Sequence, residues 1–333
     1  MIRISIFLLI VVFSYQSVVA QATYRKEEPL AHTYSIVARD PVTGEMAVGV
    51  QSHWFSVGSL VSWGESGVGV VATQSFVNPS YGLRGLELLK QGKTAQEALD
   101  ILTESDEGRE VRQAAIVDAN GNVAAFTGNM CIPFASHITG DNFSVQANMM
   151  LTDEVPSAMS DTFLKYSNLP LAERVIKAME AAEKAGGDVR GKQSAVLIVV
   201  SGNPEQPAWE DKIINLRVDD HNDPVTELAR LLRVHRAYQH MNNGDYAVEE
   251  GDMVKALNEY SQAESLFPDN MEMKFWKAIA LANNGSIQKA AEILKITYTD
   301  ENGHWKELLM RLPKVNLLTV SEKDYNLLLG AEE

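Results

Sequence analysis

The sequence predicts an α+β protein: a four-layer αββα sandwich of two mainly antiparallel sheets, followed by an all-helical tail. Segments that alternate like strands and segments that repeat like helices follow one another as strands, two helices, strands, two helices and strands. Asn120-Gly121 separates two of the strand-like segments, which is a strong signal for an antiparallel hairpin. After Asp223-Pro224 the pattern is helical throughout.

The strand predictions rest on alternation and on continuous apolar runs. Residues 33–38 alternate polar and apolar side chains, and the turn residues of 40–44 separate them from a returning strand. A loop rich in glycine and serine, 52–67, comes before a run expected to be buried on both faces. The predicted strands are 33–38, 46–50, 68–73, 111–117, 123–127, 143–149, 194–200 and 213–218.

The helix predictions rest on periodicity and on end signals. Thr94 followed by Glu97 forms a capping box, and Gly186-Gly187 is a stop signal. Asp223 before Pro224 is typical of a helix N-cap followed by proline at the first helical position. The predicted helices before the tail are 81–90, 95–102, 154–166 and 171–185.

The tail contains a repeat. Gly251 and Gly285 are 34 residues apart, as are Ala256 and Ala290, and 34 is the period of tetratricopeptide repeats. Small residues at such spacing let paired helices cross closely. We therefore predict a tetratricopeptide-like tail that binds a partner protein or a second copy of the chain, with a non-repeat helical cap as the alternative.

The first residues resemble a signal peptide. Arg3 precedes an apolar run from Ile4 to Phe13, and Ala20-Gln21-Ala22 is a small-x-small cleavage pattern. The run is too short to span a bilayer, so we expect an exported protein, periplasmic or secreted, without membrane insertion after cleavage. The predicted organisation is a signal peptide at 1–22, a linker at 23–31, the sandwich at 32–223 and the tail at 224–333.

Charge, cysteine content and the spacing of acidic residues indicate which partners, disulfides and metals to expect. The formal net charge is −15, and an excess of acid repels phosphate backbones, which argues against nucleic acid. Cys131 is the single cysteine, so no internal disulfide can form and a buried structural thiol is expected. Asp219, His221 and Asp223 alternate like metal ligands but do not fit a calcium loop, and we predict neither metal nor cofactor.

Five segments of the predicted sandwich carry recognisable motifs: 32–40, 47–52, 69–74, 187–195 and 217–221. Together they resemble domain-of-unknown-function family 1028, which is placed in the Ntn-hydrolase superfamily. The resemblance extends over about 32–232, and it implies the αββα fold and Thr33, at the head of the first strand, as the nucleophile. It leaves the substrate open, and we expect a small amide or peptide-like bond.

An N-terminal nucleophile works only as the first residue of the chain, because its freed α-amine is the general base. That amine has a pKa of roughly 7.7 to 8.0 and accepts a proton near neutral pH. Activity through Thr33 therefore requires a cut between His32 and Thr33. The alternative is that Thr33 is an ordinary strand residue. The stretch between Arg39 and Arg84 also lacks lysine and arginine, although sites of this type use a lysine beside the nucleophile.

Several other polar residues are candidates for the same catalytic site as Thr33. Ser35 lies two residues on and faces the same side of the sheet, as a supporting hydroxyl or an alternative nucleophile. His53, past a strand end, is a candidate base or substrate contact, or a loop histidine without a role. Amide side chains at strand ends could stabilise an oxyanion, or could serve only buried structural hydrogen bonds: Gln74, Asn78 and Asn148.

A second group is predicted to contact substrate. Arg190 could bind a carboxylate with its planar guanidinium, or fix a loop. Gln193 and Ser194 follow it into a strand, and Tyr81 and Asn78 complete the group. The sequence thus favours an exported amide hydrolase with Thr33, Ser35, His53, Gln74 and Asn148 in its catalytic site. The alternative is a non-catalytic binding module for a small molecule or a cell-envelope component.

Overall fold

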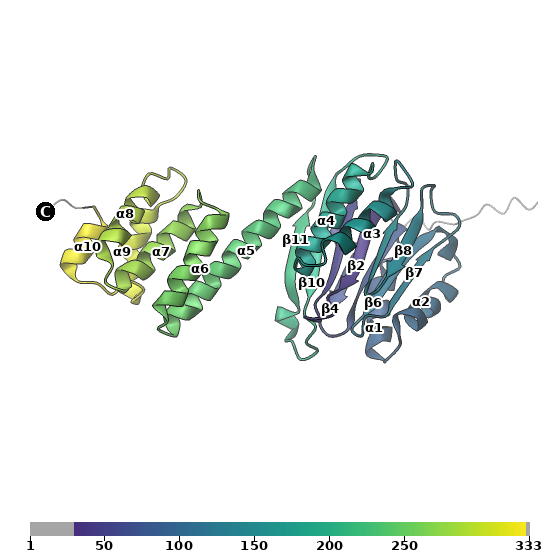
Figure 1. Ribbon diagram of the computed structural model, residues 1–333, viewed down its shortest axis with the longest axis horizontal. Coiled ribbons are helices and arrows are strands. Elements are labelled where there is room, and N and C mark those ends of the chain that lie inside the picture. The colour runs from purple at the N-terminus through teal and green to yellow at the C-terminus, as the bar shows by residue number, and fades with distance from the viewer. Residues whose placement is uncertain (1–29, 331–333) are drawn as a thin grey trace, which may run out of the picture.

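The computed structural model describes residues 30–330, which form a sandwich and an elongated helical tail (Figure 1). The predicted signal peptide lies outside the described residues. The first sheet has five strands, in which β5 pairs with β6, β6 with β7, and the other edge of β5 with both β1 and β4. Its strands are β1 (Leu30–Ala31), β4 (Ser62–Glu65), β5 (Gly69–Phe76), β6 (Arg112–Asp118) and β7 (Val123–Thr127).

The second sheet has six strands in the order β11-β10-β3-β2-β9-β8, each antiparallel to its neighbours. Together the two sheets confirm the predicted pair of antiparallel sheets. The strands are β2 (Thr33–Arg39), β3 (Met46–Ser52), β8 (Ser136–Gly140), β9 (Phe143–Ala147), β10 (Ser194–Val200) and β11 (Lys212–Val218).

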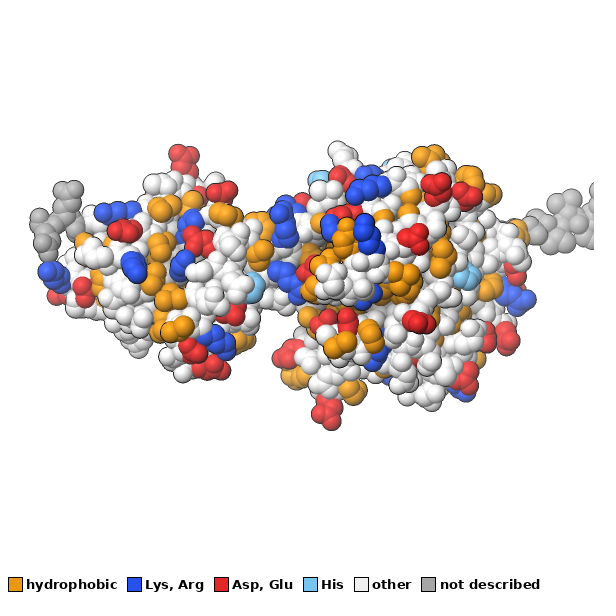
Figure 2. Space-filling model, in the orientation of Figure 1, with side chains coloured by type: hydrophobic (Ala, Val, Ile, Leu, Met, Phe, Trp, Pro, Cys, Tyr) orange, Lys and Arg blue, Asp and Glu red, His pale blue; other side chains and the backbone are white. Residues whose placement is uncertain are grey.

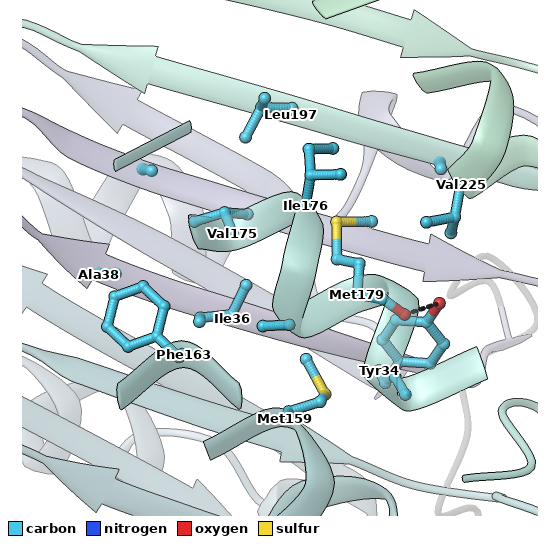
Figure 3. Packing of buried hydrophobic residues seen from close by; sticks show 14 of the residues in the cluster. Tyr34, Ile36, Ala38, Met159, Phe163, Val175, Ile176, Met179, Leu197 and Val225 are labelled. Atoms are coloured by element: carbon cyan, nitrogen blue, oxygen red, sulfur yellow. Dashed lines mark hydrogen bonds between the residues drawn. The ribbon is translucent and has the colours of Figure 1, made fainter. Parts of the chain in front are cut away.

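Helices cover the outer face of each sheet and complete the αββα order. Helices α1 (Ser80–Lys90) and α2 (Ala95–Glu104) pack on the five-stranded sheet, and α3 (Val155–Lys165) and α4 (Leu171–Lys184) pack on the six-stranded sheet. Figure 3 shows the second of these layers, where Tyr34 and Ile36 of β2 meet Met179 of α4. The predicted fold class is confirmed.

One glycine allows α4 to approach the sheet closely. A Cβ at Gly49 in β3 would lie 2.4 Å from Val175 Cγ1 and 2.9 Å from Met179 Sδ, closer than real atoms pack.

The predicted hairpin is present: Val117 pairs with Val123, and Gly121 in the turn adopts φ +86°, which suits glycine. The capping box of Thr94 and Glu97 is present at α2.

Three short strands escaped the sequence analysis. β4 lies within the predicted 52–67 loop and is only four residues long. β8 is a largely exposed edge strand, so its sequence has no strong apolar alternation. β1 lies at the end of the predicted linker, and its two residues pair with Ser75 and Phe76 of β5. Such short or exposed strands leave little hydrophobic pattern.

The tail begins with α5 (Pro224–Glu249), a single helix shared with the sandwich (Figure 1). Its first turns bury Val225 and Leu228 against the six-stranded sheet, and Met241 lies in the core of the tail. Arg236 holds it to α4 through two bonds to the Glu173 carboxylate, at 2.8 and 3.0 Å. The remaining helices are α6 (Met253–Leu266), α7 (Met271–Asn283), α8 (Ile287–Thr297), α9 (Trp305–Arg311) and α10 (Glu322–Leu328).

The surface carries interspersed charges of both signs, as Figure 2 shows for one face. Within residues 30–330 no helix combines the length and the apolar character needed to cross a bilayer.

Candidate functional site

The space between the two sheets contains a hydrogen-bonded network of buried amide side chains. Gln74 of β5 lies at its centre: its Oε1 accepts from Ser35 Oγ at 2.6 Å, and its Nε2 donates to Gln113 Oε1 at 2.7 Å. Gln146 Nε2 donates to Ser35 Oγ at 2.6 Å, and Asn148 Nδ2 donates to Gln113 Oε1 at 2.9 Å. All five side chains are fully buried, and their mutual hydrogen bonds orient them.

Alternation along the strands explains how these residues meet. In β2, Thr33, Ser35 and Val37 point into the space between the sheets, whereas Tyr34 and Ile36 point toward α4. The same period of two brings polar residues of β5, β6 and β9 to this layer. The inner faces of β5 and β6 are therefore apolar along one part and polar at the end nearest Thr33, whereas the inner residues of β9, Ser144 and Gln146, are both polar.

Thr33 lies at the edge of this network and is fully buried. Its carbonyl oxygen accepts from Gln74 Nε2 at 3.1 Å, Asn148 Nδ2 at 3.3 Å and the Asn148 backbone N–H at 3.1 Å. Its hydroxyl donates to the Ala31 carbonyl at 2.8 Å. Its nitrogen is part of the peptide bond to His32, so the described chain has no free amine at this position.

The carbonyl oxygen of His32 belongs to that same peptide bond and has two strong donors. Ser52 Oγ and Arg190 Nη2 each donate to it, both at 2.7 Å. The guanidinium is fixed by the buried carboxylate of Asp188, with Nε–Oδ1 at 3.0 Å and Nη2–Oδ2 at 2.7 Å. A rigid cation and a hydroxyl therefore converge on one carbonyl oxygen, a geometry that stabilises negative charge there.

The His32 ring is buried in a slot between the sheets. Its Nδ1 forms a hydrogen bond of 2.9 Å with Asn148 Oδ1, and its edge meets the Phe76 ring at a centroid distance of 5.5 Å. Burial is the main reason that the pKa of His32 lies below its ordinary value. The bond to Asn148 opposes this effect, and the charge of Arg190 adds to it. The imidazole is therefore neutral at physiological pH.

Backbone strain accompanies the network. Ser75 and Met149, which directly follow Gln74 and Asn148, have φ of +74° and +60°, in the left-handed region that non-glycine residues rarely adopt. Such conformations persist only where the surrounding structure imposes them, and they concentrate at functional sites. Here they turn the chain just beyond two side chains that hold Thr33.

The structure brings together five of the predicted site residues: Thr33, Ser35, Gln74, Asn148 and Arg190. Ser194 extends this group through the strand register, because Ser52 pairs with Thr33 on one side and with Ser194 on the other. The Ser194 hydroxyl donates to the Trp54 carbonyl at 2.5 Å and accepts from the Val57 N–H at 3.1 Å.

Two predicted residues lie beside this group without joining the network. The His53 backbone N–H donates to Asp188 Oδ2 at 3.1 Å, whereas its buried ring Nδ1 has no hydrogen-bond partner among residues 30–330. Gln193 is bonded to Asp220 at the end of β11, with Nε2–Oδ1 at 3.2 Å. His53 therefore shares Asp188 with Arg190 and contributes its backbone to that side of the site.

Asn78 and Tyr81 form a separate group around Asp106. Three groups donate to Asp106 Oδ2: Tyr81 Oη at 3.0 Å, Asn78 Nδ2 at 3.4 Å and Arg112 Nε at 2.9 Å. Burial, reinforced by the Asp106 charge, raises the pKa of Tyr81. Arg112 also donates to the Phe76 carbonyl at 2.6 Å, which connects this cluster to the end of β5.

Four residues of the site were not predicted from the sequence: His32, Ser52, Gln113 and Gln146. Gln146 shares the inner face of β9 with Ser144, so polar and apolar residues alternate regularly there. Gln113 occupies an inward position of β6, whose other inward residues Ala115 and Val117 are apolar. That break in alternation was a usable signal. No local pattern identifies His32 or Ser52, because their roles depend on contacts with residues distant in the sequence.

The metal and thiol predictions concern residues outside the network. Within residues 30–330, no group of three or more His, Cys, Asp and Glu side chains is arranged to hold a metal ion. Cys131 is buried as predicted, and burial raises the pKa of its thiol. Asp223 is the N-cap residue of α5, but its carboxylate interacts with Lys192 Nζ at 3.2 Å and makes no capping bond to the helix backbone.

A protein-family model and several solved structures are similar to this chain. None of the curated proteins compared matches the chain. The crystal structure of a DUF1028 protein from Silicibacter pomeroyi is 32% identical, with a TM-score of 0.56, and the match covers 65% of this chain and 89% of that one. Anbu, the ancestral beta-subunit from Yersinia bercovieri, matches at 12% identity and a TM-score of 0.31, over 59% of this chain and 91% of that one. The model of the family of unknown function DUF1028 matches residues 33–228, and the chain therefore belongs to the DUF1028 family.

Proposed function

We propose that the chain is the precursor of an exported hydrolase that cleaves amide or peptide-like bonds with Thr33 as an N-terminal nucleophile. The observation that carries this proposal is the environment of the His32–Thr33 peptide bond. Ser52 Oγ and Arg190 Nη2 both donate to the His32 carbonyl oxygen at 2.7 Å. That oxygen gains negative charge when a nucleophile attacks the bond that must be cut.

The chemistry of this cut uses groups already present. The Thr33 hydroxyl attacks the His32 carbonyl carbon, the bond between that carbon and the Thr33 nitrogen breaks, and the hydroxyl proton passes to the nitrogen. Water then hydrolyses the resulting ester, which leaves a carboxylate on His32 and a free hydroxyl and α-amine on Thr33. The same hydroxyl, with the amine as its base, can then attack an external amide.

The charge and the network around Thr33 support this role. Arg190 supplies a fixed positive charge beside the scissile bond, whereas the stretch between Arg39 and Arg84 contains no lysine or arginine. Gln74 and Asn148 hold the Thr33 carbonyl from the other side. The residue is thus fixed on both of its peptide bonds, as precise attack requires.

The test follows the full chain by intact mass and N-terminal sequencing during incubation at neutral pH. We expect a product that begins at Thr33, and we expect Thr33→Ala to remain uncut, a rate loss of at least a hundredfold. The matched control is Thr43→Ala, which changes an exposed threonine in a turn. If Thr33→Ala is cut as fast as the wild type, or no form is ever cut, the hydrolase proposal is wrong.

One observation favours a second function, a non-catalytic binding module. The Thr33 hydroxyl donates to the Ala31 carbonyl at 2.8 Å, and the amide donors near it are already used by the Thr33 carbonyl. In that case the sandwich presents a binding surface and Thr33 is a structural strand residue. An uncut, well-folded full chain in the mass experiment would favour this function.

We further propose that residues 1–22 direct export and that the tail is a tetratricopeptide-like module that binds a partner protein or a second copy of the chain. Support for the repeat comes from Gly251 and Gly285, which have φ of +78° and +79° just before α6 and α8. Gly244 packs directly under the Tyr260 ring, where a Cβ would lie 2.5 Å from Cε1. Close helix crossing of this kind is what the repeat requires.

A further inference from the structure

The three residues before Thr33 bind the sandwich as a peptide would. Leu30 pairs with Phe76 and Ala31 with Ser75, so β1 is an added strand on the edge of β5 beyond the part that β4 occupies. Strand addition of this kind is a general way to bind an extended peptide, with backbone bonds for affinity and alternate side chains for selectivity.

The slot that receives these residues has two distinct side-chain positions. Ala31 is completely buried in the apolar layer between the sheets, together with Val57 and Val77, so this position fits only a small side chain. The next position holds the His32 ring, which is 2% exposed and lies between Phe76 and Asn148. It suits a flat ring with a polar atom that reaches Asn148 Oδ1.

The far end of the slot suits a carboxylate. The His32 carbonyl oxygen is bound by Ser52 and by the Arg190 guanidinium, which the buried Asp188 holds in place. If the bond after residue 32 is cut, this carbonyl becomes a carboxylate, and its attraction to Arg190 increases because both partners are then charged.

We infer that residues 30–32 occupy the acyl side of the substrate site, and that the site accepts extended peptides whose last two acyl residues are a small residue followed by histidine or a similar polar ring. This inference rests on the proposed function, because one Thr33 hydroxyl would attack both its own chain and the substrate. The two carbonyl carbons must then reach that hydroxyl from the same side. The described chain is accordingly self-inhibited: its own Ala31-His32 fills the slot.

The experiment measures peptide binding by the full chain in a Thr33→Ala background, so that no cleavage occurs and catalysis is not needed for the readout. The probe is fluorescein-labelled Leu-Ala-His with a free carboxylate, followed by fluorescence anisotropy. A second substitution, Ala31→Trp, places a side chain too large for the buried position and expels the chain's own segment. We expect binding to the Ala31→Trp form and at least tenfold weaker binding to the parent, whose slot is filled.

Selectivity provides the sharper criterion. Leu-Trp-His and Leu-Ala-Asp should bind the opened form at least tenfold more weakly than Leu-Ala-His, and Asn148→Ala should reduce Leu-Ala-His binding by a similar factor. Equal binding of all three peptides, no binding by a folded Ala31→Trp form, or equal binding by parent and opened forms would each overturn the inference.

A milder variant covers the case in which Ala31→Trp does not fold. His32→Ala removes only the ring, and 4-methylimidazole should then raise the melting temperature of the full chain with Asn148 intact and leave the parent unchanged. Absence of that rise would overturn the inference. If the opened form binds the peptide but the wild type is never cut at His32–Thr33, the peptide site stands and the hydrolase proposal is wrong. The failure of one proposal can therefore be distinguished from the failure of the other.

Discussion

The two halves of the layer between the sheets are built from the same strands but from opposite kinds of side chain. Away from Thr33 the layer is aliphatic, with Val48, Val50 and Val70 among its fully buried members. Near Thr33 it consists of amides and hydroxyls, including Gln74 and Gln113. The residues named in both halves are fully buried, so the difference between them is chemical.

The aliphatic half needs only shape and volume to be stable, whereas the polar half is stable only if each member finds its partners. Buried amides contribute little net free energy when paired and cost much when unpaired. Aliphatic side chains at these positions would also stabilise the two sheets, and they would carry no cost from unpaired polar groups. This polar half, which is accompanied by left-handed backbone at Ser75 and Met149, is the part of the layer to which the proposed function assigns the site.

The largest effect on stability is expected for Gln113→Leu. Gln113 Nε2 donates to Thr127 Oγ1 at 2.8 Å and to the Ala147 carbonyl at 2.9 Å, and its Oε1 accepts from Gln74 and Asn148. Leucine leaves several buried groups unpaired, each costing about 1–3 kcal/mol, and we expect a loss of about 4 kcal/mol in the free energy of unfolding. Urea denaturation measures it.

The matched control is Gln96→Leu, an exposed glutamine on α2 that bonds to Asp100. We expect it to change the free energy of unfolding by less than about 0.5 kcal/mol. A Gln113→Leu loss as small as that of the control would mean that the polar half is as tolerant as the aliphatic half, and the comparison would fail.

A smaller effect is expected in the aliphatic half. Val50→Ala removes two methyl groups from a fully buried position, which should cost about 2 kcal/mol through lost transfer energy and a small cavity. Because no polar partner is lost, we expect the rate of the cut at Thr33 to stay within twofold of wild type. Val42→Ala, at a side chain that is 92% exposed, is the control for stability. A large loss of cutting in folded Val50→Ala would show that the two halves act as one.

Much of the layer between the sheets could be predicted from the sequence, but the contacts around the His32 carbonyl oxygen could not. The strands β2, β5 and β10 follow from alternation and apolar runs, and Ser35 and Gln74 were selected as polar residues near Thr33. These predictions succeed because a strand has a period of two and one strand is enough to read it.

What escaped prediction depends on pairs of segments far apart in the sequence. Ser52 and Arg190 are 138 residues apart, yet both donate to one carbonyl oxygen of His32. Likewise β1 has only two residues, and it pairs with the part of β5 at Ser75 and Phe76, which extends beyond the residues that β4 occupies. Local propensity contains no information on such contacts.

The smallest expected effect is on the pH dependence of stability, and it originates at His32. Burial lowers the pKa of His32 below that of an unfolded histidine, about 6.5. Below about pH 6.5 the unfolded chain therefore takes up a proton that folded His32 does not, and stability falls as pH falls. For one proton the slope is at most about 1.4 kcal/mol per pH unit, and above pH 7 this contribution is constant.

His32→Asn should make the decline in unfolding free energy between pH 7 and pH 5.5 shallower than in the wild type. It should not abolish the decline, because burial also lowers the pKa values of His137 and His235. Val42→Ala, the exposed control used above, changes no titratable group and should leave the slope unchanged. Urea denaturation at several pH values measures these slopes. Identical slopes for His32→Asn and the wild type would mean that His32 is accessible to protons in the folded chain, and that the polar half is open to water where the structure shows it closed.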